Sequence, residues 1–222
     1  MPAIRRRPPR LAISRAVEHS LRSLGWGRFA VVGRALLHLR AHARSFARVT
    51  DDAKLRQAKR TLLIAGALHS EIRAAFGEAR ADAIVHTLLE RVATVLQSSI
   101  YLARPLAERT WDALHEAHDE VLTVGFARVN EHVPIESSGS LVSFEITRCR
   151  LVEALRDMGA ARVAEAFCRS DEIVFGQYAP GIRFHRGTGT PDTIARGAAT
   201  CRFVFERGLA SRPLASQPVR SR

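Results

Sequence analysis

Residues 167–205 read FCRSDEIVFGQYAPGIRFHRGTGTPDTIARGAATCRFVF, and this stretch decides the fold of the C-terminal part of the chain. Apolar and polar residues alternate over 181–186 and again over 201–206, which is the period of a β-strand. In the second segment Cys201 and the phenylalanines at the next two alternate positions fall on one face. The stretch therefore predicts two strands that contribute an apolar face to a core.

The segment before this stretch mixes strand and helix patterns. Pro134 and the Ser-Ser-Gly-Ser run at 137–140 predict a loop, and residues 141–147 alternate as a third strand. A short helix is expected over 150–158, closed by Gly159, while 163–167 fits a helix or an extended segment equally well.

The first 130 residues show only helical patterns. Apolar residues recur there at three- and four-residue spacing, and glycines at 25 and 77 follow the expected ends of helices. Thr50-Asp51-Asp52 is a typical N-cap signal with acids in the first turn. The expected helices are 11–24, 28–48, 50–76, 80–99 and 105–129, the third and fourth forming an antiparallel pair.

These patterns predict an α+β fold, with a helical N-terminal part packed against a small C-terminal α+β unit that contains a mostly antiparallel sheet. The expected divisions are a disordered basic arm (1–10), the helical part (11–130), the α+β part (131–210) and a disordered tail (211–222). No apolar run approaches the roughly 20 residues that span a bilayer. With three widely spaced cysteines and no signal-peptide pattern, a cytoplasmic location with reduced thiols is expected.

The formal net charge of +12 raises the question of a nucleic-acid partner. Nearly all of the positive charge is arginine, because Lys54 and Lys59 are the only lysines, and it is spread along the chain without a basic stripe. This distribution favours a solvated basic surface over a nucleic-acid interface. The expected partner is a small-molecule substrate, with no membrane, no cofactor and no metal; a homo-oligomer is left open.

The motifs of the C-terminal part resemble a known family. Residues 62–92, LLIAGALHSEIRAAFGEARADAIVHTLLERV, are similar to the pair of helices that precedes the signature of the L-2-amino-thiazoline-4-carboxylic acid hydrolase family. The chain departs from the family pattern at Arg202, where an acid is common, and over 187–192, which is longer than usual. A weaker likeness links the closing Gly-x-x-x-Cys-x-Phe to four-vinyl-reductase-type small-molecule-binding domains. The elements of the signature are Cys149 after a strand, Cys168-x-x-Asp171, Pro180 with Phe184 and Arg186, Thr193-Ile-Ala-x-Gly197, and Cys201-x-Phe203.

The resemblance implies hydrolytic opening of a cyclic amidine or amide at a C–N bond, as in a thiazoline ring. Such a site needs a nucleophile or activated water, a group that moves a proton, and a cation for the substrate carboxylate. Cys168 is the candidate nucleophile, and Asp171 or His185 the candidate proton carrier. Arg186 is the candidate carboxylate ligand, and two further substrate-binding candidates are Thr193 and His118.

Other readings of the same residues stay open. Cys201 on a phenylalanine-lined strand is more often a core residue, Cys149 is expected to be structural, and the nucleophile is Cys168, Cys201 or neither. Three cysteines with Asp171 are also a zinc ligand set, although the absence of a Cys-x-x-Cys pair disfavours it. The alternative functions are a non-catalytic small-molecule-binding or sensor domain and a basic nucleic-acid-binding protein.

Overall fold

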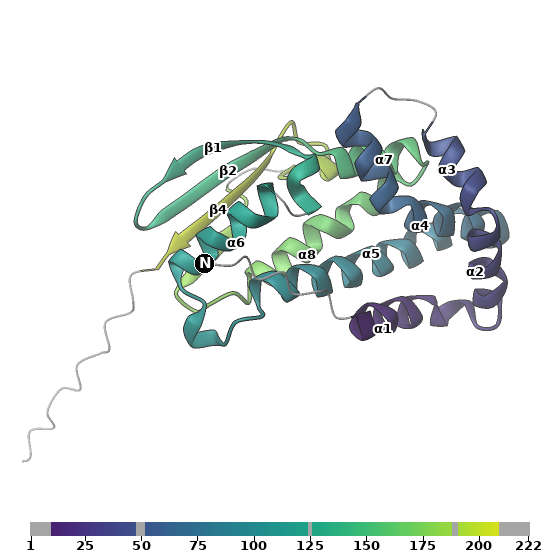
Figure 1. The fold of residues 1–222 in the computed structure, drawn as a ribbon, viewed down its shortest axis with the longest axis horizontal. Coiled ribbons are helices and arrows are strands. Elements are labelled where there is room, and N and C mark those ends of the chain that lie inside the picture. The colour runs from purple at the N-terminus through teal and green to yellow at the C-terminus, as the bar shows by residue number, and fades with distance from the viewer. Residues whose placement is uncertain (1–9, 48–51, 124–125, 188–190, 209–222) are drawn as a thin grey trace, which may run out of the picture.

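The computed structural model describes residues 10–47, 52–123, 126–187 and 191–208. The predicted arm, apart from Arg10, and the predicted tail lie outside the described residues. Helices fill one end of the molecule and a small sheet closes the other, with α8 between them (Figure 1). The predicted α+β class is confirmed.

The first 130 residues, where they are described, are helical, as the sequence predicts, with two differences. The helix expected over 105–129 begins with a 3-10 turn at Leu106–Glu108, and its α-helical part spans only Trp111–Thr123. The expected helix over 28–48 is two helices, because the chain bends at His38, which caps the first of them. Asp52 is the N-cap of the long helix that follows, and its carboxylate accepts a hydrogen bond from the backbone N–H of Leu55 at 3.0 Å. The helices are α1 (Arg10–Leu21), η1 (Arg22–Leu24), α2 (Gly27–Leu37), α3 (Leu39–Ala47), α4 (Ala53–Phe76) and α5 (Glu78–Tyr101).

The α4 and α5 helices turn back on one another at Gly77, the one residue between them. Its φ of 87° is a conformation that a residue with a Cβ rarely adopts, which is the physical reason for glycine at this position. The two helices pack against each other and share the helical core with α7. The expected pair is therefore present.

The C-terminal half contains a four-stranded antiparallel sheet in the order β1-β2-β4-β3. The three predicted strands are confirmed as β2, β3 and β4, and Ile146 of β2 lies opposite Cys201 of β4. The elements are η2 (Leu106–Glu108), α6 (Trp111–Thr123), η3 (Phe126–Val129), β1 (Glu131–Ser137), β2 (Leu141–Arg148), α7 (Arg150–Asp157), η4 (Ala161–Ala164), α8 (Glu165–Phe175), β3 (Ile182–His185), η5 (Ile194–Arg196) and β4 (Cys201–Arg207).

The loop predicted around Pro134 is wrong, because this segment is strand β1. Proline removes a backbone donor, and β1 tolerates it because it is an edge strand that pairs only with β2. The register of that pairing shifts next to Pro134, between it and Glu136, as expected for a bulge.

Two apolar clusters hold the molecule together. The first joins α2, α4, α5 and α7, so it takes residues from both sides of residue 130. The second joins α6, the C-terminal end of α8 and the inner face of the sheet. Cys149 and Ile194 contact both clusters, and the candidate site lies where the two meet. Within the described ranges, no helix combines the length and apolarity that crossing a bilayer requires.

Candidate functional site

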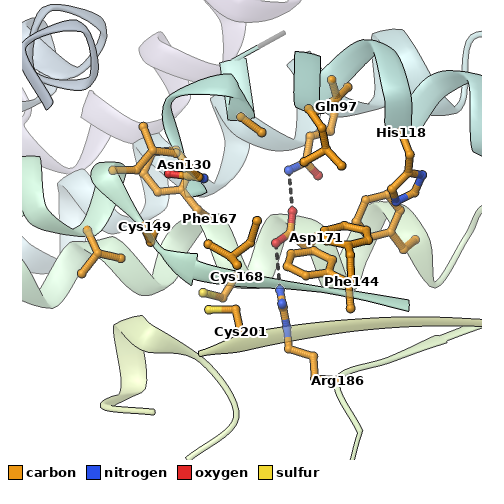
Figure 2. Close-up of a pocket in the computed structure, with 18 of the residues that line it drawn as sticks. Gln97, His118, Asn130, Phe144, Cys149, Phe167, Cys168, Asp171, Arg186 and Cys201 are labelled. Atoms are coloured by element: carbon orange, nitrogen blue, oxygen red, sulfur yellow. Dashed lines mark hydrogen bonds and ion pairs between the residues drawn. The ribbon is translucent and has the colours of Figure 1, made fainter. Parts of the chain in front are cut away.

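A pocket lies between α5, α6, α8 and the sheet (Figure 2). Its empty volume is about 770 Å³, which includes space that is open to solvent. Most of the wall is apolar, and polar side chains gather at one end. The polar or sulfur-containing lining residues are Gln97, Tyr101, His118, Asn130, Cys149, Cys168, Asp171, Arg186 and Cys201.

Helix α8 brings Cys168 and Asp171 to the pocket together. Residues three apart in a helix share a face, and both of these side chains line the pocket. The next acid, Glu172, points elsewhere and pairs with Arg169 and Arg196. The helical periodicity of this segment thus directs Asp171 into the pocket and Glu172 toward the surface.

Asp171 is held by two partners from other elements. Gln97 of α5 donates from Nε2 to Oδ1 at 2.6 Å, and Arg186, directly after β3, donates from Nη2 to Oδ2 at 2.8 Å. Figure 2 shows the three side chains in one line across the pocket. Burial raises the pKa of Asp171 above its ordinary value, although the guanidinium of Arg186 opposes the shift.

Arg186 keeps unused donors inside the protein. It is 8 % exposed, its guanidinium lies 4.4 Å from the ring centroid of Phe203, and its Nε and Nη1 are buried without a hydrogen-bond partner. Gln97 is 3 % exposed, and its Oε1 is likewise a buried acceptor without a partner. Buried polar atoms of this kind are uncommon, so the polar end of the pocket can still bind both an acceptor and a donor.

The three cysteines all line the pocket as protonated thiols. Burial raises the pKa of Cys149 to about 11 and that of Cys168 to about 12, and it also raises the pKa of Cys201. The sulfur atoms of Cys168 and Cys201 approach each other in Figure 2, and the Cys201 Sγ accepts a hydrogen bond from the backbone N–H of Ile194 at 3.0 Å. None of these thiols is therefore present at pH 7 as the thiolate that nucleophilic attack requires.

His118 lines the apolar end of the same pocket. Its Nδ1 lies 3.0 Å from the carbonyl oxygen of Leu114, so Nδ1 carries the proton and Nε2 is an acceptor, which is buried without a partner. The rings of Tyr101, Phe175 and Phe205 surround the imidazole. Burial lowers the pKa of His118 to about 4, so the ring is neutral at pH 7.

The structure does not bring His185 and Thr193 into the pocket with the other candidates. Arg186 faces inward, and His185, the preceding residue, does not line the cavity: its Nδ1 accepts from Gly187 N–H at 3.0 Å and its Nε2 lies 3.3 Å from Glu206. Thr193 is fully buried, and its hydroxyl accepts from the N–H of Arg196 at 3.3 Å as the cap of η5. Thr193 also lies near Cys168, where it lowers the pKa of that thiol, so it acts behind the pocket wall.

Gln97 lines the pocket and holds Asp171, and it was not among the residues expected from the sequence. It belongs to the face of α5 that also holds Leu89, Ala93 and Tyr101, all of them buried. A glutamine at an i, i+4 position of an otherwise apolar helix face is the signal that identifies it. Asn130 was also missed, and its Oδ1 accepts from the N–H of Arg150 at the start of α7, which is a structural role.

The zinc alternative does not fit this pocket. A zinc site brings its ligand atoms close together around the ion. In the part of the chain that the structure describes, neither the pocket cysteines nor Asp171 belong to any group of three ligand atoms that lie within 4.8 Å of one another.

Comparison with known proteins identifies a family for this chain and no individual relative. No curated protein and no solved structure matches the chain. Residues 56–205 match the family model described as L-2-amino-thiazoline-4-carboxylic acid hydrolase, and the matched span contains Gln97, Asp171, Arg186 and the three cysteines. The match covers more than half of the chain and confirms the suspected family. The chain therefore belongs to the L-2-amino-thiazoline-4-carboxylic acid hydrolase family.

Proposed function

We propose that this protein is a small-molecule hydrolase that opens the ring of a cyclic amidine or amide at the polar end of the pocket. The observation that carries the proposal is the arrangement around Asp171. Its carboxylate is held between Gln97 and Arg186, which both line the pocket and both keep buried polar atoms without a hydrogen-bond partner. The family supports a hydrolase at this coarse level.

The unpaired atoms favour a substrate that carries a carboxylate and an N–H group. Arg186 offers the N–H groups of Nε and Nη1, which point in different directions, so each can donate to a separate oxygen, and the positive charge favours an anionic group such as a carboxylate. Gln97 offers Oε1, because its amide nitrogen already donates to Asp171. An oxygen acceptor at this point binds an N–H group, which the exocyclic amino group of a 2-amino-thiazoline carboxylate supplies.

In the proposed reaction, water adds to the sp2 carbon of the ring while Asp171 accepts a proton from it. A ring bond to that carbon then breaks, and the departing ring atom takes the proton, which leaves Asp171 as it began. Asp171 suits this exchange because burial raises its pKa toward the working range of a general base. Cys168, with a pKa of about 12, is assigned to the wall of the site and not to the attack.

The bond that breaks can be identified from the product. The predicted C–N cleavage of a thiazoline leaves the sulfur bonded to the carbamoyl carbon, whereas C–S cleavage releases a free thiol. Both products gain one water and have the same mass. Mass spectrometry therefore detects ring opening, and titration of free thiol assigns the bond.

The test is turnover of 2-amino-thiazoline-4-carboxylate by purified protein. We expect Asp171→Asn to lower kcat/KM by about 100-fold or more and Cys168→Ala to stay within about 10-fold of the wild type. Glu172→Gln is the matched control, because it removes the next acid of α8, which pairs outside the pocket. Circular dichroism confirms that each variant is folded. Full activity in Asp171→Asn sinks the assignment, and a loss in Cys168→Ala as large as the one expected for Asp171→Asn would make the thiol the nucleophile.

A second candidate is a non-catalytic ligand-binding domain, which the apolar wall favours. Phe144, Phe175 and Phe203 suit retention of an apolar ligand at least as well as hydrolysis of a small polar one. This candidate predicts that the purified protein retains a small molecule, detectable after denaturation, and turns over no member of a panel of cyclic amidines and amides.

A further inference from the structure

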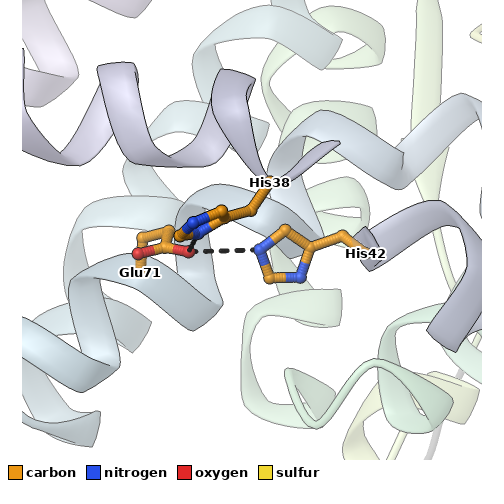
Figure 3. Close-up of side chains that lie close together, drawn as sticks. All are labelled: His38, His42 and Glu71. Atoms are coloured by element: carbon orange, nitrogen blue, oxygen red, sulfur yellow. Dashed lines mark hydrogen bonds and ion pairs between the residues drawn. The ribbon is translucent and has the colours of Figure 1, made fainter. Parts of the chain in front are cut away.

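We propose that His38, His42 and Glu71 form a binding site for a divalent transition-metal ion, separate from the pocket. Figure 3 shows the two imidazole rings turned toward the same carboxylate. Oε1 of Glu71 lies 3.0 Å from Nδ1 of His38 and 3.2 Å from Nε2 of His42. The three ligand atoms all lie within 4.8 Å of one another, which in the described residues is true of no other such trio of histidine, cysteine or acidic side chains.

The backbone fixes the two histidines relative to each other. The N–H of His38 donates to Arg34 at 2.8 Å at the end of α2, and the N–H of His42 donates to the carbonyl of His38 at 2.9 Å. The two side chains therefore lie one helical turn apart on one face. The His42 ring also stacks on Phe46, with centroids 5.7 Å apart. Glu71 comes from the C-terminal third of α4, and its side chain is 11 % exposed.

The distances fit a coordination sphere as well as they fit hydrogen bonds. Two ligands that lie about 2.1 Å from an ion and subtend 90–109° are about 3.0–3.4 Å apart. The two contacts to Oε1 fall in this range. A neutral imidazole becomes a ligand through the nitrogen that faces Oε1 by carrying its proton on the other ring nitrogen. The side chain of His38 is half exposed, which leaves room for water to complete the coordination.

The ligand types select the class of ion. Two imidazoles and one carboxylate suit Zn²⁺, Co²⁺, Ni²⁺ or Cu²⁺, while Mg²⁺ and Ca²⁺ prefer an all-oxygen shell. His38 and His42 precede residue 56, where the family match begins, and Glu71 lies within it. A bound ion would therefore fasten the α2–α3 junction, which lies outside the matched span, onto α4 of the family region.

The charge of Arg34 allows the proposed position of the ion to be tested. Its Nε lies 3.2 Å from Oε2 of Glu71 and leaves Oε1 to the histidines. The guanidinium charge repels a cation at this site, so its removal strengthens metal binding if the ion sits where we place it. A hydrogen-bonded cluster with no metal function predicts no such gain.

The experiment uses the full chain, freed of metal with a chelator, and titrates ZnCl2 by calorimetry and CoCl2 by visible absorption. We expect one ion per chain and a higher midpoint of thermal unfolding with Zn²⁺. His38→Ala and His42→Ala should each weaken Zn²⁺ binding at least about 10-fold, since each loses a ligand. Arg34→Gln should tighten it several-fold. His19→Ala is the control, because this exposed histidine lies on α1 outside the trio.

Three results would overturn the proposal. They are no binding of either ion to the wild type, binding that both histidine variants leave unchanged, or a sulfur-to-cobalt charge-transfer band, which would place the ion on cysteines. Metal-free unfolding midpoints of the variants separate lost ligands from lost folding.

Discussion

Replacing Asp171 by asparagine should destabilise the fold, because it leaves the charge of Arg186 buried without its counter-ion. The pair is 2.8 Å apart, and the side chains are 4 % and 15 % exposed. At an effective dielectric constant of about 20, attraction at this distance is about 6 kcal/mol before the cost of desolvation. Breaking such a buried pair costs about 3–5 kcal/mol in practice.

Part of that loss is offset within the site. Arg186 lies 4.4 Å from the ring centroid of Phe203 and 5.5 Å from that of Phe184, and these contacts stabilise a guanidinium by about 1 kcal/mol each. We therefore expect Asp171→Asn to lower the free energy of unfolding by about 1–3 kcal/mol. Urea denaturation followed by circular dichroism measures it, provided that the slope against urea is unchanged.

The complementary variant, Arg186→Met, should behave differently with pH. Asp171 keeps Gln97 and loses the cation that opposes its raised pKa. A carboxyl whose pKa is higher in the folded state binds more protons there, so stability is greatest at low pH and falls as pH rises through the folded pKa. We expect Arg186→Met to lose stability as the pH rises from about 4. A loss below 1 kcal/mol in Asp171→Asn, together with a flat profile for Arg186→Met, would refute the reasoning.

Three further outcomes follow from the packing of buried groups. The pKa of His118 is about 4 in the folded chain against 6.5 in the unfolded chain. The free energy of unfolding should therefore fall by up to about 3 kcal/mol as the pH drops from 6.5 to 4. Urea titrations of His118→Phe should lack this pH-dependent loss. With Cys168 at about 12, alkylation by iodoacetamide at pH 8 should be about 1,000-fold slower in the native protein than in urea, as followed by mass spectrometry; comparable rates would contradict a buried thiol. At Gly66 a new Cβ would lie 2.6 Å from Met158 Sδ and 3.2 Å from Phe46. Gly66→Val should therefore lower the free energy of unfolding by about 1–3 kcal/mol, as measured by urea denaturation. An unchanged midpoint would mean that Met158 and α4 move apart without a loss of stability.

The sequence predicts the elements better than their junctions. Helical periodicity and the Asp52 cap locate α4, and alternation locates β2, β3 and β4, because each of these segments buries one face. The bend at His38 has no glycine or proline to mark it, so the helices around it were expected as one. Strand β1 escaped because proline disfavours strands in general, and only its edge position in the finished sheet makes it tolerable.

The candidate site was predicted only in part, because a pattern within one helix can be recognised in the sequence and a contact between distant elements cannot. The spacing of Cys168 and Asp171 depends on one helix, and it is confirmed once α8 is seen to be helical. The partnership of Asp171 with Gln97 joins residues 74 positions apart, and no local pattern reports such a pair. His185 and Arg186 are neighbours in sequence, but the alternation of β3 sends one outward and one inward, and the chemistry of the residues alone did not choose between them.

The strand order β1-β2-β4-β3 also has a consequence during synthesis of the chain. Strand β4 is the last described strand, yet it pairs with both β2 and β3, so β3 has no partner in the sheet until β4 has left the ribosome. Cys201 and Phe203 complete the pocket wall in the same event. The helical core contains no residue beyond 195, whereas a nascent chain that ends near residue 200 lacks the part of the pocket wall that β4 supplies. We expect ligand binding to be acquired abruptly with the last few residues of β4, after most of the helical core can already have formed.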